Sequence, residues 1–264
     1  MPHLTWAQNL WAIAGGFLTG GLLALLGGTG SALVLPVLII LVGVRLRLAL
    51  GTAAASVALT ALLSAVFRFR QGLVQWRAVW MFVVPGMAGI AAGRQWQHAL
   101  PRHVLLTLFG VVLLFHAAIE ATGGGQPAAG IRWRRWPMWI RLAPAGALVG
   151  ILGGMLGIQG GFLATPSFML GGVPIAAAAD SSVVSVGYLG MASAVGYAVK
   201  GLVDWRVVAE YLAGGLLGTL AVRLNRGRWL QSRSMVSAGV AVTLLAVSIY
   251  LIAQNVTGFT GSSA

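Results

Sequence analysis

Two glycine-rich stretches hold the residues whose types and spacing favour the binding of a small anion. Each interrupts a long apolar run, the first at 27–31 and the second at 157–161. A helix that restarts after such a break presents free backbone N–H groups and a partial positive charge, and glycine lets a ligand approach that backbone closely. Two such helix starts facing each other would bind an anion without a buried lysine. The candidate contacts are Thr29, Gly30, Ser31, Gln159, Gly160 and Gly161.

Hydroxyl residues near the next predicted helix of each half are second candidates. Ser181 and Ser182 follow Asp180 where this helix starts in the second half, and Thr52 lies at the corresponding place in the first. Asp180 is predicted to cap the helix N-terminus, as Asp often does. The alternative is a proton carrier, because an acid inside a membrane is costly unless it is used.

His116 and Glu120 lie four residues apart and therefore share a helix face, as a helix-end pair or as a proton relay. Other catalytic chemistry lacks its residues. The sequence has no cysteine, no closely spaced pair of metal ligands, and no Gly-Lys-Ser/Thr after either break. We therefore expect no enzymatic activity, no metal and no cofactor.

The composition indicates an integral membrane protein. Of 264 residues, 58% are hydrophobic and only 8% are charged, whereas a soluble domain has about 25% charged residues. The apolar runs are long enough to cross a hydrocarbon core of ~30 Å, which takes ~20 helical residues. The 17 Lys and Arg residues stand singly or in small clusters between these runs, as charges that flank membrane spans do, and nucleic-acid binding is not expected.

The chain is predicted to be a duplication. The run from Gly20 to Pro36 recurs with the same glycine and proline spacing from Gly150 to Pro166. Later, the pattern of Gly72, Trp76 and Arg77 recurs at Gly201, Trp205 and Arg206. Self-similarity of this kind indicates repeated structural units. We assign a first transmembrane repeat to 11–120, a basic Gly/Pro-rich linker to 121–138 and a second repeat to 139–253.

Each repeat is predicted to hold one interrupted region, at 11–43 and 140–173, followed by three helices. These helices are expected at about 49–67, 78–97 and 101–120, and at about 177–199, 206–222 and 231–253. If each interrupted region returns as a hairpin, most basic residues share one side, whereas single spans divide them almost evenly; the positive-inside rule favours hairpins. Each half then crosses the membrane three more times. The predicted fold is an all-α integral membrane protein of two inverted repeats, with both termini non-cytoplasmic.

At the glycine breaks the sequence resembles the sulfite exporter TauE/SafE family, also called TSUP permeases. The stretch Gly157-Ile158-Gln159-Gly160-Gly161-Phe162-Leu163-Ala164-Thr165-Pro166 is similar to the family pattern Gly-x-Gly-Gly-Gly-Phe-x-x-x-Pro, and the stretch at 201–205 is similar to a later motif. The resemblance covers about 11–253 and implies transport of small sulfur-containing anions, such as sulfite or sulfonates, or of other organic acids. Gln159 departs from the pattern by replacing a glycine, and Thr29 and Ser31 depart from it in the first copy.

The sequence therefore predicts a multi-pass permease of a bacterial-type inner membrane. It would bind a small anion, such as sulfite or sulfoacetate, at facing helix N-termini and expose it to alternate sides. The lipid bilayer is its other expected partner, and a homodimer is compatible with the sequence. The alternative is a membrane scaffold whose glycines serve helix packing alone. A cation permease is disfavoured, because only Asp180 and Glu120 could supply negative charge near the core.

Overall fold

The computed structural model describes residues 6–69, 72, 74–121, 136–157, 160–225 and 233–260, and within them the regular structure is helical. The first half contains α1 (Trp6–Leu26), the 3₁₀ segment η1 (Gly27–Leu33), α2 (Val34–Pro36), the π-helical segment η2 (Val37–Leu41), α3 (Leu46–Phe69), α4 (Trp76–Ala99) and α5 (Arg102–Ala121). The second half contains α6 (Met138–Leu156), α7 (Gly161–Leu170), α8 (Ile175–Ala198), α9 (Trp205–Leu224) and α11 (Arg233–Thr260).

Seven helices in the described part of the chain are long and apolar enough to cross a bilayer: α1, α3, α4, α6, α8, α9 and α11. A shorter apolar helical run extends from His103 to Ile119 in α5. The prediction of an all-α, multi-pass membrane protein is confirmed. The six helices expected after the interrupted regions are found within about three residues of their predicted bounds, except that α11 continues to Thr260, beyond the expected end at about 253. The predicted linker at 121–138 lies mostly outside the described residues.

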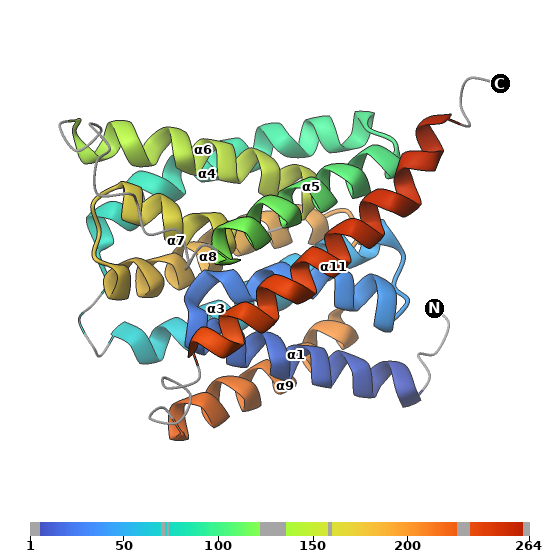
Figure 1. Cartoon of the computed structure of the whole chain (residues 1–264), viewed down its shortest axis with the longest axis horizontal. Helices are drawn as coiled ribbons and strands as arrows, with labels where there is room; N and C mark the ends of the chain where they lie inside the picture. The colour runs from blue at the N-terminus through green and yellow to red at the C-terminus, as the bar shows by residue number, and fades with distance from the viewer. Residues whose placement is uncertain are drawn as a thin grey trace.

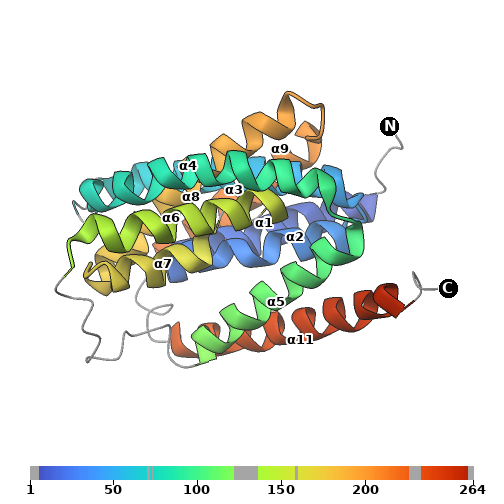
Figure 2. The same cartoon turned by 90° about the horizontal axis from the view of Figure 1, so that it is seen from above.

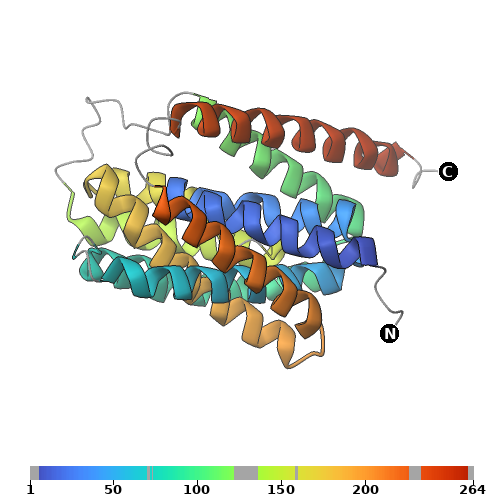
Figure 3. The same ribbon diagram turned by 90° about the horizontal axis from the view of Figure 1, so that it is seen from below.

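The helices lie along one long axis, and α1 begins at the same end of the bundle at which α11 ends (Figure 1). Helices α3 and α8 are the most buried of the spans and pack against each other. Helix α1 packs along α9, and α6 packs along α4. Helices α5 and α11 pack together as an outer layer beside the rest of the bundle (Figures 2 and 3).

Both interrupted regions turn back on themselves (Figure 1). In the first, α1 ends at Leu26 and the chain returns through η1, α2 and η2. In the second, α6 ends at Leu156 and α7 returns along it. Positive φ angles at Gly27 (+82°), Gly157 (+64°) and Gly160 (+62°) make these turns, a conformation that side-chain-bearing residues rarely adopt. Each hairpin therefore has a first arm of membrane-spanning length and a short second arm.

Glycines let the flanking helices approach backbone to backbone. Gly16 and Gly20 of α1 lie against the backbone of Tyr211 and Gly215 of α9. In the other half, Gly146 and Gly150 of α6 lie against the backbone of Phe82 and Gly86 of α4. Without a hydrophobic drive between helices in lipid, such close contact supplies much of the packing energy. Gly214 and Gly218 of α9 likewise lie against the backbone of Ile13 and Phe17 of α1.

Gly20→Ala is expected to destabilise the fold far more than Gly21→Ala. A Cβ at Gly20 would overlap the backbone of Gly215, whereas a Cβ at Gly21 would meet its nearest atoms at 3.6 and 3.7 Å, an ordinary contact. Overpacking of this kind costs about 1–3 kcal/mol. Thermal unfolding in detergent, followed by the fluorescence of the 10 tryptophans, would show a lower midpoint for Gly20→Ala alone. Equal midpoints for the two variants would contradict the close α1–α9 contact.

Candidate functional site

The two glycine breaks lie directly against each other. Gly28, in η1, and Gly161, the first residue of α7, are so close that a Cβ on either would overlap the carbonyl group of the other. Ser31 joins this contact, because a Cβ at Gly161 would lie 2.8 Å from its hydroxyl oxygen. We call this contact of Gly28 with Gly161 the glycine crossing. It brings two helix breaks from distant parts of the sequence to one place beside α8.

Ser182 of α8 connects the parts of the crossing. The backbone N–H of Gly28 donates to Ser182 Oγ at 3.1 Å, and Thr165 Oγ1 of α7 donates to the same oxygen at 2.9 Å. The Ser182 hydroxyl in turn donates to the carbonyl of Ala179 at 2.8 Å. Ser31 Oγ donates to the carbonyl of Gly28 at 2.9 Å. The crossing therefore gathers three buried or nearly buried hydroxyls and one backbone N–H that can serve an anion.

The predicted site residues divide between this crossing and other places. Ser31, Gly161 and Ser182 meet at the crossing. Gly30 instead faces Leu22 and Leu23 of its own first arm, and Gly160 faces Val149 of α6. Gln159 and the side chain of Thr29 lie outside the described residues. Gly28 also belongs to the crossing but was absent from the predicted contacts. Its position in the repeated glycine and proline pattern is the signal that points to it. The hydroxyl of Thr165, in the second glycine and proline stretch, reaches the crossing as well.

The hydroxyls of Thr52 and Ser181 lie away from the crossing. Each accepts a hydrogen bond from a backbone N–H of the opposite half, so the two bonds are reciprocal. The backbone N–H of Asp204, just before α9, donates to Thr52 Oγ1 of α3 at 3.0 Å. The backbone N–H of Gln75, just before α4, donates to Ser181 Oγ of α8 at 3.0 Å. Each hydroxyl thus fastens the start of a helix from the opposite half. Their role in the structure is to connect the halves.

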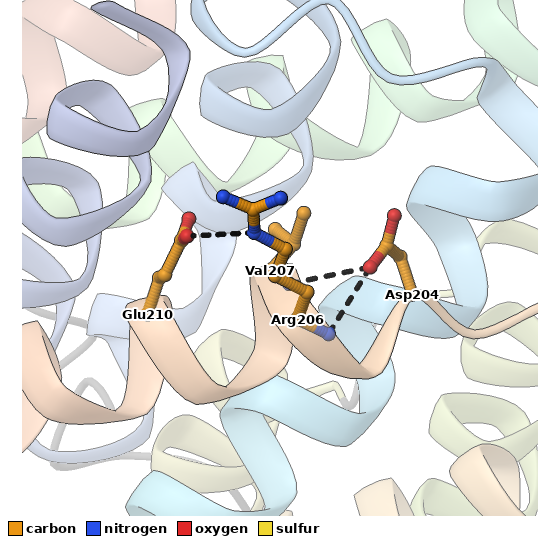
Figure 4. A network of polar contacts seen from close by, with 4 residues as sticks. All are labelled: Asp204, Arg206, Val207 and Glu210. Carbon is orange, nitrogen blue, oxygen red and sulfur yellow. Dashed lines mark hydrogen bonds and ion pairs between the residues drawn. The ribbon is translucent and has the colours of Figure 1, made fainter. Parts of the chain in front are cut away.

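The acidic residue that caps a helix is Asp204. Its carboxylate accepts hydrogen bonds from the backbone N–H groups of Arg206, at 3.1 Å, and Val207, at 3.3 Å, and Arg206 pairs with Glu210 at 3.4 Å (Figure 4). The prediction that Asp180 caps α8 is wrong, because α8 begins at Ile175 with Pro174 as its N-cap. A proline sets φ at about −65° without needing its own N–H, so the helix starts earlier than the acid indicates.

Asp180 is a buried residue within the second turn of α8. His116 is fully buried in α5, but the side chain of Glu120 lies outside the described residues, so their pairing stays a prediction. No group of three metal-ligating side chains occurs within the described ranges.

A cavity of about 670 Å³ opens at the end of the bundle where α3 begins and α4 and α8 end. Its lining includes Arg45, Arg47, Gln97, Tyr197 and Leu50. Leu50 also contacts the second break, since a Cβ at Gly157 would lie 2.8 Å from its Cδ2. Nothing local in the sequence indicates that a cavity lies beside Arg45 and Arg47.

Span-length helices and two returning, glycine-broken hairpins in contact define a multi-pass membrane protein with discontinuous helices. The chain belongs to the sulfite exporter TauE/SafE family, whose sequence model matches residues 12–251. The predicted family is therefore confirmed. The family name and those of the relatives below identify the chain as a membrane permease.

Several bacterial proteins resemble this chain over most of their length. A probable membrane transporter protein of Xylella fastidiosa (strain 9a5c) is 31% identical over 243 residues, which cover 91% of this chain and 93% of that protein. A protein of the same description from strain Temecula1 / ATCC 700964 is 32% identical over 248 residues, with coverage of 91% and 93%. The probable membrane transporter protein YdhB of Bacillus subtilis (strain 168) is 24% identical over 212 residues, 76% of this chain and 84% of YdhB. No solved structure matches the chain.

Thr52→Val and Ser181→Ala are each expected to destabilise the protein by about 1 kcal/mol, because a partly buried backbone N–H loses its acceptor. The affected groups are the N–H of Asp204 and the N–H of Gln75. Thr243→Val is the control, since this exposed hydroxyl of α11 bonds only to the carbonyl of Gly239 in its own helix. Unfolding midpoints in detergent would rank both variants below the control. A control variant as unstable as either would show that these hydrogen bonds do not hold the halves together.

Proposed function

We propose that this chain is a permease for small sulfur-containing or organic anions, such as sulfite or sulfonates like sulfoacetate, that bind at the glycine crossing. The observation that carries the proposal is the convergence of Gly28, Thr165 and Ser182 through hydrogen bonds, with Gly161 in close contact with Gly28, at one buried point between two helix breaks. Irregular backbone at membrane depth is tolerated where it is buried in protein or lines a cavity. The family and the names of the relatives support transport as the use of this irregularity.

The chemistry of the crossing suits an oxyanion. Its hydrogen-bond donors are the N–H of Gly28 and the hydroxyls of Ser31, Thr165 and Ser182. The start of α7 at Gly161 adds a helix N-terminus, which attracts negative charge. In the described state these groups bond to one another. We infer that the crossing separates during transport, and that the anion then replaces the hydrogen bonds centred on Ser182.

The two halves are proposed to be inverted repeats, at 11–120 and 139–253 with a linker at 121–138, that carry out alternating access. Their contacts are reciprocal: α1 packs on α9 as α6 packs on α4, and the hydrogen bond from Asp204 to Thr52 has its equivalent from Gln75 to Ser181. Helices α1 and α6 also run in opposite directions along the bundle (Figure 1). If the two halves exchanged conformations, the crossing would open first to one side of the membrane and then to the other.

The orientation in a bacterial inner membrane follows from the basic residues. Helix α3 ends, and α4, α6 and α11 begin, at the end of the bundle with most arginines, which the positive-inside rule places in the cytoplasm. The termini would then be non-cytoplasmic. A homodimer stays a prediction.

A scaffold function is the second candidate, and the glycine contacts between α1 and α9 and between α4 and α6 favour it, since they need no ligand. It does not account for Ser182, whose hydroxyl accepts two hydrogen bonds from separate broken segments. A measurement of transport activity distinguishes a permease from a scaffold.

Ser182→Ala and Ser31→Ala are expected to lower saturable uptake of labelled sulfite and sulfoacetate into proteoliposomes about tenfold at low substrate concentration. A hydrogen bond to a charged group is worth about 1.5–3 kcal/mol, and each variant removes one hydroxyl donor. Ser185→Ala is the matched control, because this serine is equally buried on α8 but bonds to the carbonyl of Ser181, at 2.9 Å. No flux of any tested anion through the folded wild type would reject the permease for these substrates and favour the scaffold.

The orientation predicts which end of the protein is labelled from outside the cell. The chain contains no cysteine, so Ala99→Cys at the end of α4 and Trp136→Cys just before α6 each introduce a unique thiol. Both positions are exposed. A membrane-impermeant maleimide should label Ala99→Cys in intact cells and Trp136→Cys only after permeabilisation. The reverse pattern would place the termini in the cytoplasm.

A further inference from the structure

The cavity of about 670 Å³ beside the start of α3 carries positive charge at its mouth. Arg45 and Arg47 line it and are exposed, and neither guanidinium has an ion-pair partner among the described residues. A smaller cavity at the same end of the bundle is lined by Arg94 and Lys200. None of the residues that line either cavity is acidic in the described ranges. Charges of one sign around a hollow with low-dielectric walls raise the local concentration of the opposite ion.

One wall of this cavity is polar and held in place. Gln97 is only 7% exposed and Tyr197 only 2%, and the Tyr197 hydroxyl donates to Gln97 Oε1 at 3.0 Å. Within the described part of the chain, this is the one hydrogen bond of the Gln97 side chain, so its amide N–H₂ group is available to a ligand. Arg94 lies 5.2 Å from the Tyr197 ring centroid and donates to the carbonyl of Gly196. These contacts orient the Gln97 amide as a fixed donor in the cavity wall.

The remaining wall is apolar, with Leu46, Leu50, Leu100, Leu105 and Leu202 among its residues. A bare inorganic oxyanion there would lose hydration that leucines cannot replace. An organic anion places its charged head near the arginines and its aliphatic body against the leucines. The volume lies within the range of about 300–1,000 Å³ that is typical of pockets for organic ligands.

We propose that this cavity is a vestibule that selects a short organic anion, a sulfonate or carboxylate on an aliphatic body, over cations. It also favours such an anion over inorganic oxyanions, so that of the proposed substrates the sulfonates enter more readily than sulfite. Arg45 and Arg47 attract the anionic head, and the Gln97 amide donates to it. Leu50 forms the boundary toward the second break, because it lines the cavity and also contacts Gly157. The onward passage of the anion to the glycine crossing rests on the proposed function, whereas selection in the vestibule does not.

The test uses the absence of cysteine from the chain. Leu100→Cys and Leu46→Cys each introduce one thiol into the cavity wall of the full-length protein. Their rates of reaction with anionic 2-sulfonatoethyl methanethiosulfonate and with its cationic trimethylammonium counterpart are measured in neutral-lipid vesicles. Each rate is divided by that of the same reagent with a small free thiol. The anionic reagent is expected to react about tenfold faster than the cationic one after this correction.

Arg45→Gln/Arg47→Gln should abolish this preference, and added salt should weaken it. Arg206→Gln is the control for the loss of an exposed arginine at this end of the bundle: Arg206 does not line the cavity, so this variant should leave the preference unchanged. Ethanesulfonate should slow the labelling at lower concentrations than sulfate does, because only ethanesulfonate has an apolar body.

Three results would overturn the proposed vestibule. Equal corrected rates for the two reagents, or no reaction at either thiol in folded protein, would show that the cavity is not an anion-selective aqueous site. Protection by sulfate equal to that by ethanesulfonate would remove the organic preference. Loss of labelling in vesicles that contain anionic lipid would assign the site to lipid headgroups.

The failure of the vestibule and the failure of the proposed function can be distinguished. Charge selection without any flux would reject the proposed transport and leave the vestibule. Flux without charge selection would reject the vestibule and leave the proposed transport.

Discussion

The rest of the structure depends on one constraint: a backbone that leaves helical geometry inside a membrane must find its hydrogen-bond partners in the protein. Both glycine breaks create such groups, and lipid offers none in return. At the first break, the N–H of Gly28 bonds to Ser182 of the other half. The second break supplies Thr165 to the same hydroxyl. The first hairpin is therefore completed by the opposite half, and both breaks are joined through the one hydroxyl of Ser182. A site shared between the halves is a direct consequence.

Close glycine contact makes this sharing geometrically feasible. The long first arms, α1 and α6, lie against α9 and α4 with backbone in contact with backbone, so the short second arms are drawn to the centre beside α3 and α8. Hydroxyls of α3 then face α9: Thr52 bonds to the N–H of Asp204, and Ser64 lies 3.3 Å from Thr219. The glycines that a scaffold would use for packing and the hydroxyls that a permease would use for binding are thus parts of the same structure. Packing glycines position the crossing, and the crossing holds the polar groups.

Much of this architecture could be predicted from the sequence, for physical reasons. Apolar length identifies the spans, and positive-φ turns need glycine, so Gly27, Gly157 and Gly160 could be located as breaks. Which glycines face the other hairpin could not be derived, because η1 and the turn before α7 have no regular period: Gly30 and Gly161 were both expected at the site, yet only Gly161 reaches it. The cap of α8 was misplaced at Asp180, since Pro174 starts the helix earlier without a side-chain signal.

The vestibule lies at an end of the bundle where the two repeats differ in their side chains. Both repeats keep the glycines of the breaks and a hydroxyl, Thr52 or Ser181, that accepts a hydrogen bond from the opposite half. They need not keep the side chains at the two ends of the bundle. In the register that aligns Thr52 with Ser181, Arg45 corresponds to Pro174 and Arg47 to Ala176, so the paired arginines at the mouth occur in one half only. The two faces of the protein therefore differ in charge although their backbones correspond. For a permease that exposes one central site to alternate sides, this difference would make anion capture differ between the two sides of the membrane.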